Sequence, residues 1–358
     1  MRAARLEQHN EPLVIGDFLE PEIAADEVLV RVDAVGVCRT DWHQWKGDWE
    51  WLGFLFPLPL IPGHEFAGTV VEVGSAVARI KNGDRVTVPF HEGCGTCESC
   101  TAGSSNRCLN LSFPGFTHSG AFGELVAVAH ADFNCVVLPE NVDAASAATL
   151  SCRYMSAYRA VARQGRLEAG ESIAIHGAGG MGLAAVQIAK RLGGQIVVVD
   201  KRKDALTKAL DEGADSVVVA TESLDVVAAV RDATGGGAHV SIDAIGGQET
   251  SVNCIASLRR AGRFVQAGLT TKEFKGNVTI PMDLVVALEL EIVGSFGNPR
   301  SDYNALMSMV ARGQLNPGSL VTRRANIAEI NSIIEDLDGF DTVGVNVIDS
   351  FTPNGGES

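Results

Sequence analysis

The first part of the chain, to about residue 150, has the hydrophobic pattern of a β-rich unit. Apolar and polar positions alternate in part along residues 28–35 and 68–74, as they do in strands with one buried face. Turn residues recur at 81–84, and helical periodicity is nearly absent. We therefore expect short strands joined by turns, followed by a connecting helix at 151–163.

The pattern changes after residue 171. Residues 172–176 form a short apolar run, 177–182 form a glycine-rich turn, and 183–192 carry apolar side chains at helical spacing. A second apolar run covers 195–200, and the alternation repeats more loosely at 216–219, 240–244 and 263–267. Continuous apolar strands that alternate with helices predict a parallel, doubly wound sheet.

These two patterns predict an α/β protein with two domains. The β-rich, barrel-like domain comprises residues 1–152 and 298–358, because mixed character returns near the C-terminus. The doubly wound, Rossmann-type domain comprises residues 153–297. A chain of 358 residues is long enough to give each domain a core of its own.

Charge and composition narrow the function. The 29 basic and 44 acidic side chains give a net charge of −15, which argues against nucleic acid or an anionic membrane as a partner. We find no export signal and no apolar run of membrane-spanning length, so we expect a cytoplasmic protein with a small-molecule substrate. Eight cysteines in such a chain indicate metal ligation in a reducing compartment.

Half of the cysteines lie within fifteen residues, at the spacing C-x2-C-x2-C-x7-C. Thiolates this close in sequence can converge on one tetrahedral ion, and a closed shell of four sulfurs is typical of structural zinc. Disulfides are the weaker alternative, because nothing else in the chain indicates secretion. We expect these residues to bind a zinc that takes no part in chemistry: Cys94, Cys97, Cys100 and Cys108.

The glycine-rich turn is a candidate dinucleotide site. Gly177, Gly179 and Gly182 form G-x-G-x-x-G between a predicted strand and a predicted helix, with Gly180 in the same turn. The helix N-terminus would attract a pyrophosphate. Asp200 ends the next strand, where a carboxylate binds a ribose and repels a 2′-phosphate, so NAD is favoured over NADP. Two basic residues follow that could soften this repulsion, Lys201 and Arg202.

Two other groups have the residue types of metal ligands, namely Cys38 with His43, and His64 with Glu65. Taken alone, a single cysteine or histidine is more often a core or surface residue. Combined with the dinucleotide turn and the cysteine loop, they make the chain resemble the zinc-dependent medium-chain alcohol dehydrogenases along nearly its whole length. Gly63-His64-Glu65-x2-Gly68-x5-Gly74 matches every fixed position of that family's zinc motif. Residues 47–49, 58–64 and 292–296 resemble the yeast and bacterial tetrameric members most closely.

The resemblance implies a second, catalytic zinc held by Cys38, His64 and Cys152, with its fourth position open to substrate or water. Glu65 would lie beside this metal and ligate it transiently, as in the family, and Asp41 would orient His64. The implied cofactors are thus two zinc ions and NAD, and the implied assembly is a homotetramer or a dimer.

The resemblance also implies a route for the proton. A zinc lowers the pKa of a bound alcohol, hydride passes to the nicotinamide, and the alcohol proton leaves through Thr40 and then His43. The family often has an arginine at the coenzyme pyrophosphate where this chain has Val345, so Arg39 is expected to take part of that role.

The substrate pocket is the least defined part. Trp49 and Phe90 correspond to pocket positions of the family. All four tryptophans lie within residues 42–51, in an apolar segment that extends to 56. This segment either packs on the domain or a subunit interface, or forms a pocket wall for a bulky or aromatic substrate.

The expected activity is reversible hydride transfer between a primary or secondary alcohol and NAD, which gives an aldehyde or ketone. A polyol or sugar dehydrogenase of the same superfamily is the main alternative, although those enzymes often use a carboxylate where this chain has Cys152. A non-catalytic nucleotide-binding protein on the same fold is a further alternative, since a fold alone does not define a function.

Overall fold

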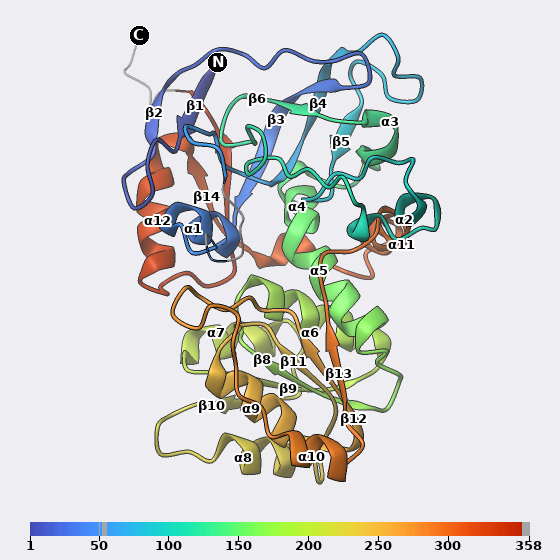
Figure 1. The fold of residues 1–358 in the computed structure, drawn as a ribbon, viewed down its shortest axis with the longest axis vertical. Helices are drawn as coiled ribbons and strands as arrows, with labels where there is room; N and C mark the ends of the chain where they lie inside the picture. Colours follow the sequence, from blue (N-terminus) through green and yellow to red (C-terminus); the bar gives the residue numbers. More distant parts are fainter. Residues whose placement is uncertain (50, 52–55, 353–358) are drawn as a thin grey trace. The chain divides into compact units, whose positions relative to one another are not determined.

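The structure is a computed structural model that describes residues 1–49, 51 and 56–352. The chain divides into two compact units (Figure 1). The β-rich unit comprises Met1–Met155 and Gly297–Ser358, and the α/β unit comprises Ser156–Phe296. None of the helices in the described part of the chain is long and apolar enough to cross a membrane.

The β-rich unit contains a two-stranded and a seven-stranded sheet. Its strands are β1 Arg2–Arg5, β2 Val14–Asp17, β3 Val28–Val37, β4 Glu65–Val73, β5 Arg85–Thr87, β6 Leu125–Val128, β7 Val136–Val137, β14 Val321–Asn326 and β15 Val345–Ser350. The larger sheet has the order β14-β15-β3-β4-β5-β7, and β6 also pairs with β3. The pairing is antiparallel except between β14 and β15.

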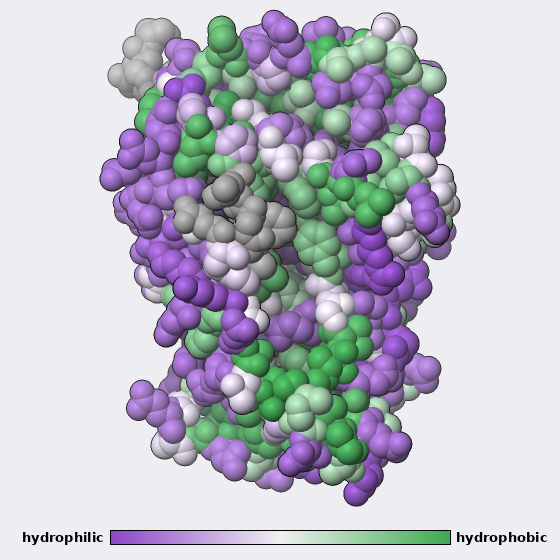
Figure 2. Space-filling view, viewed as in Figure 1, coloured by the Kyte–Doolittle hydropathy of each residue, from purple (hydrophilic) through white to green (hydrophobic). Residues whose placement is uncertain are grey.

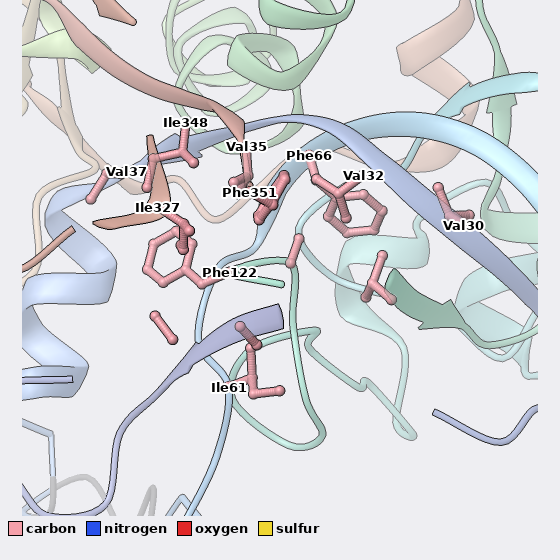
Figure 3. Close-up of a cluster of buried hydrophobic side chains, with 14 of the residues drawn as sticks. Val30, Val32, Val35, Val37, Ile61, Phe66, Phe122, Ile327, Ile348 and Phe351 are labelled. Carbon is pink, nitrogen blue, oxygen red and sulfur yellow. The ribbon is translucent and has the colours of Figure 1, made fainter. Parts of the chain in front are cut away.

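Strand β3 shows how the sequence pattern builds the core of this unit. Val30 and Val32 are buried, and the side chains of Val35 and Val37 also point into the core (Figure 3). The phase of the alternation therefore changes after Val32. The register of β3 against β4 shifts between Val32 and Ala34, and such a bulge turns the following side chains to the other face. Both halves of this strand can thus contribute valines to one core.

Short helices join these strands. They are α1 Arg39–Lys46, α2 Glu98–Thr101, α3 Ala131–Asn134, α4 Ala144–Thr149, α11 Arg300–Ala311 and α12 Ile330–Asp338. The helix predicted at 151–163 is present, but α5 (Met155–Tyr158) lies between two wider, π-helical turns at Leu150–Tyr154 and Arg159–Gln164. Such turns are frequent at functional sites, and the first one carries Cys152.

The α/β unit has one six-stranded, fully parallel sheet, and this confirms the predicted fold class. Its strands are β8 Ser172–His176, β9 Gln195–Asp200, β10 Ser216–Val219, β11 Ala238–Asp243, β12 Leu258–Gln266 and β13 Glu291–Gly294. Its helices are α6 Gly180–Leu192, α7 Lys203–Asp211, α8 Val226–Ala233, α9 Gln248–Ala256 and α10 Met282–Ala287. The strand order is β10-β9-β8-β11-β12-β13, so the order reverses next to β8, where doubly wound sheets bind their ligands.

The surface of the α/β unit has an apolar area. Hydrophobic residues gather on the face of this unit that is seen in Figure 2. The exposed apolar side chains include Met282 and Val286 of α10 and Ile292 of β13, the strand at one edge of the sheet. An exposed strand edge beside apolar side chains is a surface that proteins usually cover.

Candidate active site

The predicted ligand Cys38 lies where β3 ends and α1 begins. It is the N-cap residue of α1 and has an extended backbone. Its N–H donates to Oδ2 of Asp41 at 2.8 Å, which satisfies one of the free amides at the helix start. The other carboxylate oxygen of Asp41 lies 2.9 Å from Nδ1 of His64. One buried carboxylate therefore connects the backbone of one predicted ligand to the ring of another.

The hydrogen bond to Asp41 determines which nitrogen of His64 is available. His64 precedes β4 and is completely buried. When Nδ1 carries the proton and donates to Asp41, Nε2 keeps its lone pair. Nε2 is buried and has no nitrogen or oxygen partner among the described residues, and the thiol of Cys38 is the polar group that interacts with this ring besides Asp41. A buried imidazole in this state, with its other nitrogen held by a carboxylate, is the usual form of a metal ligand.

Four donor atoms converge at this point. One donor atom from each of Cys38, His64, Glu65 and Cys152 lies within 4.8 Å of the other three, and all four residues are buried. A hydrogen bond from Cys152 is the main cause that lowers the pKa of Cys38. Bond lengths of about 2.0–2.3 Å make the edges of a tetrahedral zinc site about 3.3–3.8 Å long, so this donor set fits zinc in type and size. The structure brings together three segments that are far apart in the sequence.

Glu65 has a partner that the sequence analysis missed. The side chain and backbone N–H of Arg153 bind both carboxylate oxygens of Glu65, in a pair that is buried on both sides. Burial raises the pKa of Glu65 to about 7, and the charge of Arg153 opposes this rise. The only sequence signal for this contact was the position of Arg153, directly after Cys152.

The two predicted relay residues lie on α1. Oγ1 of Thr40 lies 3.6 Å from Sγ of Cys38. Nδ1 of His43 lies 2.8 Å from Oδ2 of Asp48, a buried carboxylate whose role the sequence analysis also missed. Burial lowers the pKa of His43, although Asp48 opposes this shift. A carboxylate thus holds the imidazole of His43 in one orientation.

Aromatic rings surround the predicted ligand His64. Its ring centroid lies 6.2 Å from that of Phe90 and 5.3 Å from that of Phe116, and Phe116 is 6.4 Å from Trp49. Phe116 had no sequence signal that would have singled it out. Trp42 packs in the core of the unit instead, so the tryptophans do not act as one group. Residues 50 and 52–55 of the tryptophan-rich segment lie outside the described residues.

Arg39, the predicted pyrophosphate contact, is engaged within the β-rich unit. Its guanidinium carbon lies 3.6 Å from the ring centroid of Trp42 and 4.0 Å from that of Phe340. It also donates to the carbonyl of Leu337. These contacts give Arg39 a packing role, and its contact with a coenzyme stays a prediction.

The four-cysteine loop forms a second donor cluster. Its four sulfurs lie within 4.8 Å of one another, and each of the eight cysteines in the chain is a free thiol. Backbone N–H groups point at the sulfurs, as the N–H of Cys97 does at Sγ of Cys94 over 3.4 Å. Hydrogen bonds from Thr96 lower the pKa of Cys94 to about 5. A set of four thiols with amide donors around it fits a closed zinc site.

The glycine turn of the α/β unit connects β8 to α6. Gly177 has a φ of +107°, and a Cβ on Gly182 would lie 1.8 Å from the carbonyl oxygen of Gly177. Gly179, the N-cap of α6, has open space where its Cβ would be. Oδ2 of Asp200 accepts from the N–H of Ala178 at 2.7 Å. The turn is therefore closed tightly on one side, open on the other, and bound to the carboxylate at the end of β9.

The two basic residues after Asp200 differ in their contacts. Arg202 pairs with Asp204 at 2.6 Å, and its N–H donates to Oδ1 of Asp200 at 2.8 Å. The side chain of Lys201 is 75% exposed and lies 3.8 Å from Glu249. Lys201 is therefore the more exposed of these two side chains.

Comparisons with known proteins agree with this geometry. The family described as "Alcohol dehydrogenase GroES-like domain" matches residues 24–140, and "Zinc-binding dehydrogenase" matches residues 180–312. An alcohol dehydrogenase of Geobacillus stearothermophilus is 34% identical over 340 residues, which cover 94% of this chain and 96% of that protein. An NAD-dependent alcohol dehydrogenase of Sulfurisphaera tokodaii is 34% identical over 357 residues, which cover 97% and 99%.

The fold agrees as well. The crystal structure of the alcohol dehydrogenase from Aeropyrum pernix has a TM-score of 0.88 and 31% identity, and the match covers 97% of this chain and 99% of that one. Identity of this extent over nearly the full length, together with both family matches, establishes the relationship. The chain therefore belongs to the zinc-dependent medium-chain alcohol dehydrogenase family.

Proposed function

We propose that this protein is a zinc- and NAD-dependent alcohol dehydrogenase that interconverts a primary or secondary alcohol with its aldehyde or ketone. The observation that carries the proposal is the buried donor cluster, in which Cys38, His64 and Cys152 offer two sulfurs and one nitrogen within 4.8 Å. A structural protein on the same fold has no need of such a buried, incomplete donor set.

Cys38, His64 and Cys152 would hold the catalytic zinc and leave one position for the substrate oxygen. When bound, zinc lowers the pKa of an alcohol as a Lewis acid, and NAD accepts the hydride from the carbinol carbon. Asp41 fixes the tautomer of His64, because its carboxylate can only accept the proton on Nδ1. Phe90 and Phe116 place aromatic rings beside His64, and such apolar surroundings strengthen electrostatic interactions at the site.

Residues of α1 would carry the alcohol proton away. The hydroxyl of Thr40 can accept the proton and donate its own, since a hydroxyl is both donor and acceptor. His43 then receives the proton, and Asp48 orients the imidazole and favours its charged form. The reverse reaction uses the same residues in the opposite order.

The glycine turn and Asp200 would bind the coenzyme. Gly177, Gly179, Gly180 and Gly182 give the turn its shape, and the start of α6 supplies amide donors to the pyrophosphate. The Asp200 carboxylate would accept hydrogen bonds from the adenosine ribose and repel a 2′-phosphate, which favours NAD. Lys201 and Arg202 would weaken that repulsion only in part, because Arg202 is already paired with Asp204.

Three finer assignments follow from the contacts within each unit. Cys94, Cys97, Cys100 and Cys108 would hold a structural zinc, which gives two zinc ions per chain. Trp49, Phe90 and Phe116 would form an aromatic wall that suits bulky or aromatic substrates. The apolar surface at β13 and α10 would be covered by further copies of the chain in a homotetramer or dimer.

The test is a panel of alcohols with NAD and with NADP, read by the absorbance of the reduced coenzyme. Cys38→Ser should abolish oxidation and lose one of two zinc ions while NADH binding persists. Cys254→Ser is the matched control, because Cys254 is equally buried but belongs to neither donor cluster. Full activity of Cys38→Ser would refute the proposal.

A further inference from the structure

The catalytic donor cluster contains one potential ligand more than an open site can use. A carboxylate oxygen of Glu65 lies within 4.8 Å of the donor atoms of Cys38, His64 and Cys152. Four protein donors around zinc make a closed, structural site, whereas a catalytic site has three and keeps one position open. The proposed function therefore requires that Glu65 be kept from completing the shell.

Arg153 has the contacts to do this. Its Nε lies 3.0 Å from both Oε1 and Oε2 of Glu65, its Nη2 contacts Oε2, and its backbone N–H donates to Oε1 at 3.1 Å. Three N–H groups of Arg153 thus engage both oxygens of the carboxylate, which has about four acceptor positions. The planar guanidinium also fixes the direction of the carboxylate, which a lysine ammonium would not do.

The backbone leaves a place for this pair. Gly36 on β3 lies opposite Glu65 on β4 in the antiparallel ladder. A Cβ on Gly36 would lie 2.5 Å from Oε2 of Glu65 and 3.0 Å from Nη2 of Arg153. Only glycine at this position lets the two side chains lie against the strand. The pair is thus held by its own hydrogen bonds and by its contact with the backbone of β3 at Gly36.

We propose that Arg153 is a positioning residue that holds Glu65 away from the metal and so keeps one coordination position open for substrate. The proposal rests on the proposed function, because it presupposes a metal held by Cys38, His64 and Cys152. It makes the difference between an open and a closed site depend on a residue that is not itself a ligand.

Azide binding to the cobalt(II)-substituted enzyme tests this role. Azide changes the visible absorption of cobalt only where a coordination position is open, so the closed four-cysteine site gives no azide-dependent difference spectrum. Wild type is compared with Arg153→Met and with the double variant Arg153→Met/Glu65→Gln. Arg263→Met is the matched control, since it removes another paired, partly buried arginine–glutamate contact, to Glu171, in the other unit.

We expect Arg153→Met to bind azide about 10- to 100-fold more weakly, as is usual when a residue that orients a metal site is lost. The double variant should regain wild-type affinity, because glutamine is a poor ligand, and Arg263→Met should not differ from wild type. If Arg153→Met does not fold, Arg153→Lys should show the same loss to a smaller extent.

Two results would overturn the role of Arg153. One is wild-type azide affinity in Arg153→Met, or in Arg153→Lys where only that variant folds. The other is a double variant that stays as weak as Arg153→Met. A wild-type cobalt enzyme without any azide response has a different meaning, because it would show that no open metal position exists and would overturn the proposed function itself.

Discussion

Replacing Gly182 by alanine tests the geometry of the proposed coenzyme-binding turn most directly. The added Cβ would lie 1.8 Å from the carbonyl oxygen of Gly177 and 2.9 Å from its carbonyl carbon. Real Cβ atoms essentially never come closer than 3.0 Å, so the turn would have to move by about 1.2 Å. Because the neighbour is backbone at the end of a central strand, it cannot simply rotate away. Overpacking of this kind costs about 1–3 kcal/mol of unfolding free energy.

Gly179 provides a matched comparison in the same turn. It has a φ of −75°, which alanine adopts without strain, and no atom lies within 4 Å of its Cβ position. We expect Gly179→Ala to keep the stability of wild type. The new methyl group would occupy the open side of the turn, where a pyrophosphate would approach the start of α6 under the proposed function, so NADH binding should weaken by about tenfold or more.

The assay combines thermal unfolding with NADH fluorescence titration. At about 2–4 °C per kcal/mol, Gly182→Ala should lower Tm by about 2–12 °C, while Gly179→Ala should leave Tm unchanged and raise the Kd for NADH. An unchanged Tm in Gly182→Ala would refute the close contact between α6 and the turn. Wild-type NADH affinity in Gly179→Ala would refute the coenzyme site at this turn.

Three further predictions concern pH and metal. Burial lowers the pKa of His176 to about 4, below its ordinary value of about 6.5, so the folded state binds this proton less readily than the unfolded chain. The unfolding free energy should therefore fall by about 3 kcal/mol from pH 6.5 to pH 4. In denaturant titrations, His176→Gln should lack this part of the pH dependence. Asp41→Asn should weaken zinc binding by about 10- to 100-fold in chelator competition, and unchanged affinity would argue against the orienting bond to His64. Cys97→Ser should lower the zinc content from two ions per chain to one and lower Tm, whereas two retained ions would exclude the four-cysteine site.

The sequence predicted the α/β fold because its signals are local. Continuous apolar strands, a glycine turn and a following amphipathic helix lie within residues 172–200, and the handedness of parallel crossovers leaves few ways to arrange them. The family resemblance also rested on local signals, because the family's motifs are short and fixed in spacing. The comparisons confirm it. Alternation in β3 was only partly visible, because the bulge after Val32 changes the phase in the middle of the strand.

Contacts between distant side chains could not be predicted in this way. Glu65 and Arg153 are 88 residues apart, and no periodicity or motif connects them before the fold is known. Asp48 lies only five residues from His43, but the left-handed Gly47 that ends α1 determines that the two meet. Ring contacts of Phe116 depend likewise on packing. Two of the missed residues, Arg153 and Asp48, thus orient predicted site residues, and the third, Phe116, contacts the ring of a predicted ligand.

The two candidate metal sites differ in how they depend on the fold. Cys94 and Cys108 enclose a short loop, so the entropy cost of bringing these thiols together is small and a zinc ion can organise the loop locally. Cys38 and Cys152 are more than a hundred residues apart and meet only after β3, β4 and the first π-helical turn have packed. The same assembly brings Arg153 to Glu65, so the proposed open position would arise together with the residue proposed to keep it open. A zinc in the four-cysteine loop would thus support folding, whereas the proposed catalytic site would be a product of folding, and only the four-cysteine loop could be predicted from spacing alone.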